Sequence, residues 1–172
     1  MLADAGAPVA VCGFGLAASG AGAAHEIALR RPSHVILVGS AGSYDLERAP
    51  IGSALTASAV RCHGIGAGEL SPAELWWSGS DQIELTGSGG LVLSVAAASA
   101  TLEEAAMRLR KHPQAVVEEM EGYSVALAAT MWEVPLSIVR GVSNAAGDRQ
   151  TAGWRMPEAM AAAGSVVASM LG

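Results

Sequence analysis

Short apolar runs alternate with helical segments along this 172-residue chain, and this alternation constrains its fold more than any other feature. Apolar strands that alternate with helices are typical of α/β proteins whose sheet is buried on both faces. The predicted strands span 8–13, 35–38, 52–60, 91–95, 115–117 and 135–139, and the predicted helices span 16–29, 101–111 and 122–132, with a last helix near Pro157. We therefore predict an α/β fold over residues 1–172, a single domain with a mixed, largely parallel sheet flanked by helices in three layers.

Local signals support two of these helices. Thr101 and Glu104 form the Thr-x-x-Glu capping box that begins a helix. Pro157 suits the first turn of the last helix, where its missing N–H leaves no hydrogen bond unmade. The stretch 61–90 is rich in Gly and Ser and contains Trp76-Trp77. We expect it to be a long irregular loop with at most one short element.

The composition excludes several classes of protein. The hydrophobic fraction is 51% and the charged fraction 15%, which disfavours disorder. The ten Lys and Arg residues form no basic stripe and the formal net charge is −6, so we expect no nucleic-acid partner. The mean hydropathy is +0.38, but no apolar run is long enough to span a bilayer and no leader pattern is recognisable. The sequence therefore predicts a cytoplasmic protein without a membrane partner.

Cysteine and histidine spacing gives no indication of a metal. Cys12 and Cys62 lie far apart, and Cys12 falls in a predicted strand. Buried free thiols are the favoured interpretation, and a disulfide stays open. The four histidines lack the spacing of metal ligands. We expect neither a metal site nor a cofactor.

Two glycine-rich segments follow the first predicted strands. Gly13-Phe14-Gly15-Leu16-Ala17-Ala18 matches the dinucleotide-binding pattern, which also requires an acid at the end of the next strand. That strand ends in Val38-Gly39-Ser40 and has no acid there. A tight turn into a helix, which can face a ligand, therefore explains the pattern better than NAD binding. Gly39-Ser40-Ala41-Gly42 can bring backbone N–H groups close to a ligand. Taken alone, this segment favours an ordinary strand-to-loop turn.

Carboxylates and an amide follow two later strands. Glu118, Glu119 and Glu121 surround Met120 just before a helix, where acidic groups also complement the helix dipole. Asn144 offers a donor and an acceptor to the edge of a flat heterocycle, or an Asx-type bond to the backbone. Because ligands of α/β folds bind at the carboxyl ends of strands, these groups together predict a site for a polyhydroxylated, nitrogen-rich small molecule.

The motifs together resemble a known group of enzymes. The matching segments are 13–15, 38–42, 51–52, 119–122, 125–126, 139–144, 147–149, 154–155 and 157–159. From about Val9 to its end the chain resembles the purine nucleoside phosphorylase and nucleosidase superfamily, and within it the futalosine hydrolases of menaquinone biosynthesis. The combination of Glu-Met-Glu-Gly with Arg-Gly-Val-Ser-Asn is more specific than either motif alone.

The resemblance implies a role for each site residue. Glu121 would accept hydrogen bonds from the 2′- and 3′-hydroxyls of ribose, and Met120 would pack against the sugar. Asn144 would bridge N7 and O6 of a 6-oxopurine, because relatives that act on 6-aminopurines carry Asp there. Catalytic roles are thus expected for Asn144 and Glu121, and substrate-binding roles for Met120, Glu119, Ser40, Gly42, Gly15, Ser143 and Arg149.

The resemblance also implies a reaction and two alternatives. Leu37 stands where related phosphorylases carry a phosphate-binding arginine, which favours hydrolysis of a nucleoside such as futalosine. Family members begin with a further strand and a loop whose glutamate activates water. Met1 to Ala7 offers no counterpart and only Asp4 as an acid, so the chain looks shortened. A catalytically impaired nucleoside-binding paralogue and a methylthioadenosine/S-adenosylhomocysteine-type nucleosidase are the alternatives, and a homo-oligomer is implied.

Overall fold

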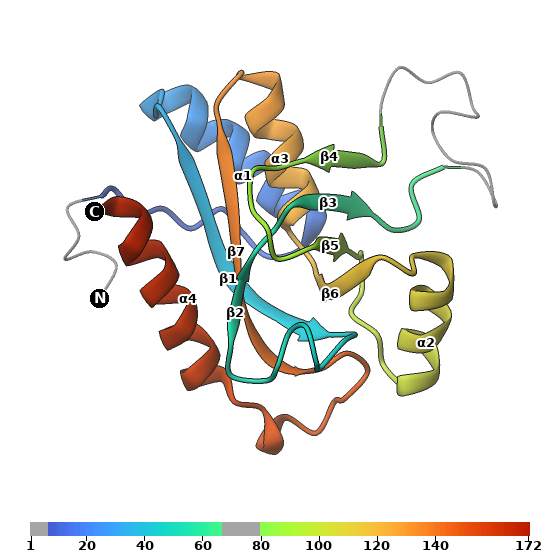
Figure 1. The fold of residues 1–172 in the computed structure, drawn as a ribbon. Coiled ribbons are helices and arrows are strands. Elements are labelled where there is room, and N and C mark those ends of the chain that lie inside the picture. The colour runs from blue at the N-terminus through green and yellow to red at the C-terminus, as the bar shows by residue number, and fades with distance from the viewer. Residues whose placement is uncertain (1–6, 67–79) are drawn as a thin grey trace.

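A mixed sheet organises the fold in the computed structural model, which describes residues 7–66 and 80–172 (Figure 1). Its strands are β1 Val35–Ser43, β2 Ala54–Thr56, β3 Ala59–Cys62, β4 Gln82–Glu84, β5 Leu91–Ser94, β6 Ala115–Glu119 and β7 Leu136–Ala145. Their order in the sheet is β2-β7-β1-β6-β5-β3-β4. The pairs β1–β7, β3–β5 and β5–β6 are parallel, and the pairs β1–β6, β2–β7 and β3–β4 are antiparallel. The predicted α/β class is confirmed, with more antiparallel pairing than expected.

The sheet curls because one bent segment joins strands that lie far apart in the sheet order. β2 pairs with β7 and β3 pairs with β5, yet only Ala57 and Ser58 separate β2 from β3. The N–H of Ala57 bonds to the carbonyl of Ile138 at 2.9 Å, and the N–H of Ser58 bonds to that of Gly90 at 3.0 Å. The predicted single strand 52–60 is therefore two short strands on either side of this bend.

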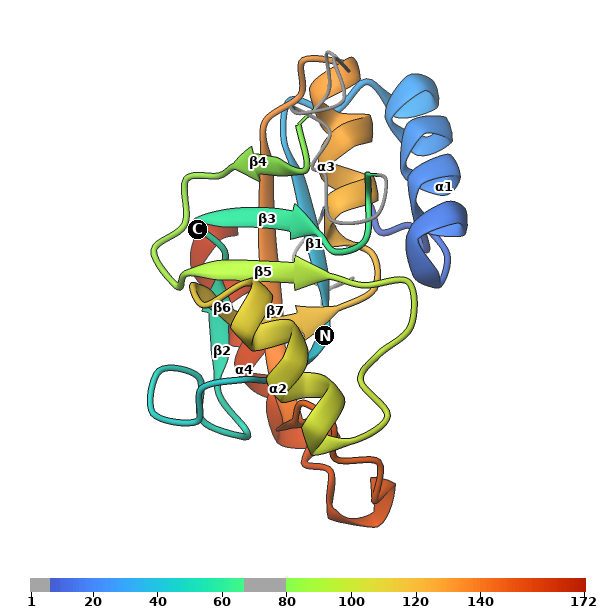
Figure 2. The same ribbon diagram turned by 90° about the vertical axis from the view of Figure 1, so that its right-hand side faces the viewer.

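Helices cover both faces of the sheet (Figures 1 and 2). They are α1 Gly15–Arg30, α2 Leu102–Lys111, α3 Gly122–Met131 and α4 Met156–Leu171. α1 packs on α3 on one side of β1 and β7, and α4 packs on β7, β1 and β2 on the other. The hydroxyl of Thr101 accepts the N–H of Glu104 at 3.2 Å, and a proline stands in the first turn of α4, so both predicted helix starts are confirmed.

The main core lies between the sheet and the pair α1–α3. Its fully buried strand residues include Val60, Val92, Val117, Ile138 and Val142, which face small residues of the two helices. Burying a side chain of this size contributes roughly 1.5–3 kcal/mol. The alternate residues of β7 and β1, such as Val139, pack on α4 in a separate cluster. Burial on both faces explains why these strands are continuous apolar runs.

The predicted strand 8–13 is wrong. In the structure this segment is irregular, and Val9 and Val11 are 59% and 92% exposed. No strand of the described residues pairs with it, and an apolar run without a hydrogen-bonding neighbour has nothing to hold it extended. Cys12 consequently does not lie in a strand. Both cysteines are free thiols, Cys62 buried and Cys12 partly so.

β1 and β7 are longer than predicted. Their parallel ladder runs from Val35–Leu136 to Ser43–Ala145, with an irregularity after Ala41. Gly39-Ser40-Ala41-Gly42 therefore continues β1, and the predicted turn at this segment is wrong. Asn144 likewise lies inside β7 rather than after its strand. Each strand is extended because the neighbour supplies hydrogen-bond partners that a local sequence pattern does not reveal.

Part of the predicted loop 61–90 belongs to the sheet, since β3 reaches Cys62 and β4 begins at Gln82. Trp76-Trp77 and the N-terminal Asp4 lie outside the described residues. Within the described chain, no helix combines the length and apolarity that crossing a membrane requires.

Candidate active site

A buried arginine links the three central strands. Arg140 of β7 is only 2% exposed, and its Nη2 forms an ion pair with Glu119 of β6. β1 lies between those two strands, so the side chain must pass over it. It passes over Gly39, where an added Cβ would lie 1.9 Å from Nη1 of Arg140. Any side chain at position 39 would therefore displace the guanidinium.

Glu119 is held by protein donors on both carboxylate oxygens. Its Oε2 accepts the N–H of Glu121 at 2.9 Å and that of Gly122 at 2.7 Å, in addition to Arg140. Its Oε1 accepts the hydroxyl of Ser94 on β5. An added Cβ on Gly122 would lie 2.9 Å from Oε1, so glycine leaves room for this carboxylate. Glu119 thus satisfies the first N–H groups of α3, the helix-end role considered for the acidic cluster.

Glu121 stands at the N-terminal end of α3 with its carboxylate partly open to solvent. The N–H of Gly15 donates to Oε1 at 3.0 Å, and Nη2 of Arg140 lies 3.4 Å from Oε2. The side chain is 15% exposed, whereas that of Glu119 is 0% exposed. Gly13 and Gly15 have φ of +113° and +76°, which confirms the predicted tight turn into α1. That turn faces Glu121.

Asn144 is oriented by its neighbours on β7 and in the following loop. Its Nδ2 donates to the carbonyls of Ala145 at 2.8 Å and Asp148 at 3.3 Å. Its Oδ1 accepts the hydroxyl of Ser143 at 2.7 Å. The indole N–H of Trp154 donates to the same Asp148 carbonyl at 3.2 Å. The Asx-type backbone bond considered from the sequence is therefore present, and Ser143 fixes the amide.

The remaining predicted residues lie around these two groups. Gly42 of β1 is paired with Asn144 on one side and with Glu118 on the other, and Ser40 is half-buried in the same strand. Met120 is half-buried against the cluster that contains Leu93. Arg149 is exposed, with its guanidinium carbon 5.1 Å from the centre of the Trp154 ring.

Glu118 belongs to a different network on the other face of β6. Its Oε2 accepts the hydroxyls of Tyr44 at 2.5 Å and Ser99 at 2.7 Å, and Nη1 of Arg108 lies 3.2 Å away. Burial, followed by the hydrogen bond to Glu118, raises the pKa of Tyr44. Because Arg108 lies on α2, this network holds that helix against the sheet. Glu118 and Glu119, neighbours on one strand, therefore belong to separate contact networks.

Arg140 and Ser94 are site residues to which the sequence interpretation assigned no role, although Arg140 begins the Arg-Gly-Val-Ser-Asn motif. The sequence signal for Arg140 is a charged residue directly after the largely apolar run Leu136–Val139. In the structure, Arg140 and the residues that follow it in β7 are buried as well. Its neighbour in the ladder is Gly39, which gives it space. Ser94 carries no local signal, since its role depends on pairing with Glu119 across β5 and β6.

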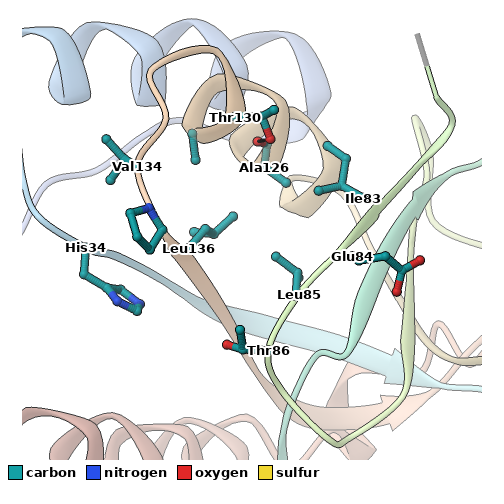
Figure 3. Close-up of a pocket in the computed structure, with 11 residues that line it drawn as sticks. His34, Ile83, Glu84, Leu85, Thr86, Ala126, Thr130, Val134 and Leu136 are labelled. Carbon is teal, nitrogen blue, oxygen red and sulfur yellow. Dashed lines mark hydrogen bonds between the residues drawn. The ribbon is translucent and has the colours of Figure 1, made fainter.

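A cavity of about 280 Å³ lies near the residues that begin β1 and β7 (Figure 3). His34, which precedes β1, and Leu136, which begins β7, line it together with residues of α3 and of the segment around β4. Asn144 lies near the other end of β7, so this cavity is separate from the Glu121 and Asn144 groups. In the described parts of the chain, no three His, Cys, Asp or Glu side chains converge as metal ligands would.

Two curated relatives are similar to this chain. A futalosine hydrolase of Streptomyces coelicolor is 34% identical over 147 residues, which are 77% of this chain and 63% of that protein. A futalosine hydrolase of Acidothermus cellulolyticus is 41% identical over 71 residues, which are 41% of this chain and 29% of that protein. The chain thus spans less than two thirds of the length of each of these relatives.

Solved structures show the same fold. A methylthioadenosine/S-adenosylhomocysteine nucleosidase of Colwellia psychrerythraea in complex with adenine matches with a TM-score of 0.80 and 22% identity, covering 93% of this chain and 75% of that one. The corresponding nucleosidase of Helicobacter pylori matches with a TM-score of 0.80 and 20% identity, covering 94% and 78%. The family model described as the phosphorylase superfamily matches residues 2–172. This chain belongs to the phosphorylase superfamily.

Proposed function

We propose that the protein hydrolyses the N-ribosidic bond of a purine nucleoside, with a 6-oxopurine nucleoside such as futalosine as its substrate. The observation that carries this proposal is the Glu121 carboxylate, which is partly exposed and is held by Gly15 and Arg140 at the carboxyl end of β6. Similarity to two futalosine hydrolases supports the choice of substrate.

The charge around Glu121 suits cleavage of a glycosidic bond. Glu119 and Glu121 share one guanidinium, so the group carries one net negative charge. Breaking an N-ribosidic bond develops positive charge on the sugar, and a fixed negative group lowers the free energy of that transition state. Glu121 accepts hydrogen bonds from the ribose hydroxyls, and this places the sugar next to the negative charge. Met120 packs against the ribose.

Asn144 recognises the base. A 6-oxopurine presents acceptors at N7 and O6, and the amide NH₂ can donate to both. In the structure these protons bond to two backbone carbonyls, of which that of Asp148 is the more distant at 3.3 Å. The purine acceptors replace both of these bonds, while Ser143 keeps Oδ1 in place. Ser40, Gly42 and Arg149 are further proposed binding residues.

A nucleoside-binding protein with little activity is a second candidate. One observation favours it: within the described residues, Glu119 is buried among protein donors, and Glu121 is assigned to the ribose hydroxyls, so neither acid is assigned to activate water. Loss of a positioned general base typically lowers a rate by about 10²–10⁴. A methylthioadenosine-type nucleosidase shares the fold, but Asn144 argues against a 6-aminopurine substrate.

The resemblance to the same family also supports a proposal for the setting of this activity. We propose that the protein acts in the cytoplasm as a homo-oligomer, serves menaquinone biosynthesis and needs no cofactor. Its partner is a small nucleoside rather than a nucleic acid or a membrane, which agrees with the net charge of −6.

Chromatography of the released base tests the reaction and its substrate. Purified protein is incubated with futalosine, inosine and methylthioadenosine, each with and without phosphate. We expect hypoxanthine from futalosine at the same rate in both buffers. Release that requires phosphate would refute hydrolysis, and adenine from methylthioadenosine alone would refute the 6-oxopurine assignment. Binding without release would support the second candidate.

A further inference from the structure

We propose that Glu119 is a positioning residue that does not touch the nucleoside: it holds Arg140 and the first turn of α3, and thereby presents the Glu121 carboxylate. This inference rests on the proposed function, in which Glu121 binds the ribose. It assigns different tasks to the two acids of the Glu-Met-Glu-Gly motif.

Both carboxylate oxygens of Glu119 already accept buried protein donors. A carboxylate offers about four lone-pair positions. Ser94, Arg140 and the N–H groups of Glu121 and Gly122 supply the donors. The side chain has no exposed surface. A ribose hydroxyl could reach it only by displacing one of these buried bonds.

The arginine depends on Glu119 for its position. Nη2 of Arg140 contacts Glu119 closely and lies 3.4 Å from Oε2 of Glu121, while its buried Nε has no partner among the described residues. Without Glu119, the guanidinium would pair with Glu121 alone. That pairing would occupy the carboxylate oxygen that the ribose hydroxyls need.

The backbone of Glu121 depends on Glu119 as well. Glu121 is the residue at the N-terminal boundary of α3, and its own side chain makes no capping bond. Its N–H bonds to Glu119 instead, as does the N–H of Gly122. Glu119 therefore sets both the start of the helix and the direction in which the Glu121 side chain leaves it.

The first test needs no nucleoside. In ¹⁵N-labelled protein, the buried Nε–H of Arg140 should give a slowly exchanging resonance, assigned by its absence in Arg140→Lys. We expect this resonance to persist in Glu121→Gln and in Glu47→Gln, a control at an exposed carboxylate. It should shift or broaden in Glu119→Gln, whose amide can still accept the N–H groups of α3. An unchanged resonance in Glu119→Gln would overturn the proposal even if the protein bound no nucleoside.

The second test separates positioning from direct contact. Glu119→Gln should weaken inosine binding about tenfold, the effect of one lost hydrogen bond to a charged group. If Glu119 acts through Arg140, this loss should be much smaller when Arg140 is already Lys, because the two effects are then not additive. Equal losses in both backgrounds would indicate direct contact and refute the proposal. Failure of the wild-type protein to bind inosine would refute only the proposed function. The resonance test would still decide whether Glu119 positions Arg140.

Discussion

Arg140 on β7 contacts Glu119 on β6 across the backbone of β1. The contact joins three strands through two charged side chains that are almost completely buried. Such a pair adds little net stability, because desolvation offsets the attraction, but removal of one partner costs about 3–5 kcal/mol. The pair is therefore better explained by the geometry that it imposes on Glu121 than by stability.

Gly39→Ala should break this geometry with a single methyl group. The new Cβ would overlap Nη1 of Arg140, and we expect a loss of about 1–3 kcal/mol in the free energy of unfolding. Urea denaturation measures it. The control is Gly164→Ala in α4, where a Cβ meets nothing within 4 Å and should stabilise the helix by about 0.5–1 kcal/mol. Equal stability of the two variants would show that the arginine can move without cost.

Asn144→Asp should change the preferred base. A carboxylate cannot donate to O6 unless it is protonated, so affinity for inosine should fall relative to adenosine by about tenfold or more. Calorimetric titration of both nucleosides measures the ratio. Asn144→Ala is the control, which should lower both affinities without reversing the preference. An inosine preference that survives in Asn144→Asp would remove Asn144 from base recognition.

Stability should fall between pH 6.5 and pH 4 because of two histidines. Nδ1 of His63 lies 3.0 Å from Nε2 of His112. Burial, followed by the charge of His63, lowers the pKa of His112 from 6.5 to about 4, and burial lowers that of His63. The unfolded chain then binds more protons than the folded chain in this range. The contribution of the neutral histidines to stability is therefore fully present above pH 6.5 and is lost as the pH falls towards 4.

The urea midpoint of unfolding at pH 7 and at pH 4.5 measures this loss. Carboxylates contribute to the same trend, so the comparison is with His112→Asn, in which the pair is absent. We expect a smaller drop in that variant. An identical drop would show that the histidine pair does not contribute.

The reactivity of the Cys12 thiol should depend on the charge of Glu121. Burial raises the pKa of the Cys12 thiol, and the negative charge of Glu121 adds to the rise. Iodoacetamide should therefore react slowly at pH 8, and faster in Glu121→Gln because the thiolate is then less disfavoured. Cys62 is the internal control, since burial and then Asp81 raise its pKa. Mass spectrometry distinguishes the two sites, and equal acceleration at both would contradict the electrostatic effect of Glu121 on Cys12.

Local patterns were sufficient to predict the elements with their own signals. The capping box at Thr101, the turn at Gly13 and Gly15, and the proline of α4 all lie where expected, because each depends on neighbours in sequence. The acidic motif was correctly located at a helix start. The strand 8–13 failed for the opposite reason, since a strand needs a partner that the local sequence does not contain.

The arrangement of the site could be predicted only in part. The sequence indicated that Glu121 and Asn144 follow or end apolar strands, but not that β1 would separate β6 from β7. That order alone places Arg140 over Gly39 and next to Glu119. The division between Glu118, which holds α2, and Glu119, which holds α3, likewise depends on the two faces of β6 and not on the order of the acids.

The most direct test of the account is the affinity of the purified protein for inosine, measured by calorimetry on wild type, Glu121→Gln and the exposed-site control Glu47→Gln. We expect wild type and Glu47→Gln to bind alike, and Glu121→Gln to bind about tenfold or more weakly, since the ribose hydroxyls lose a charged acceptor. Equal affinity of Glu121→Gln and wild type would contradict the central claim that Glu121 holds the ribose of a purine nucleoside.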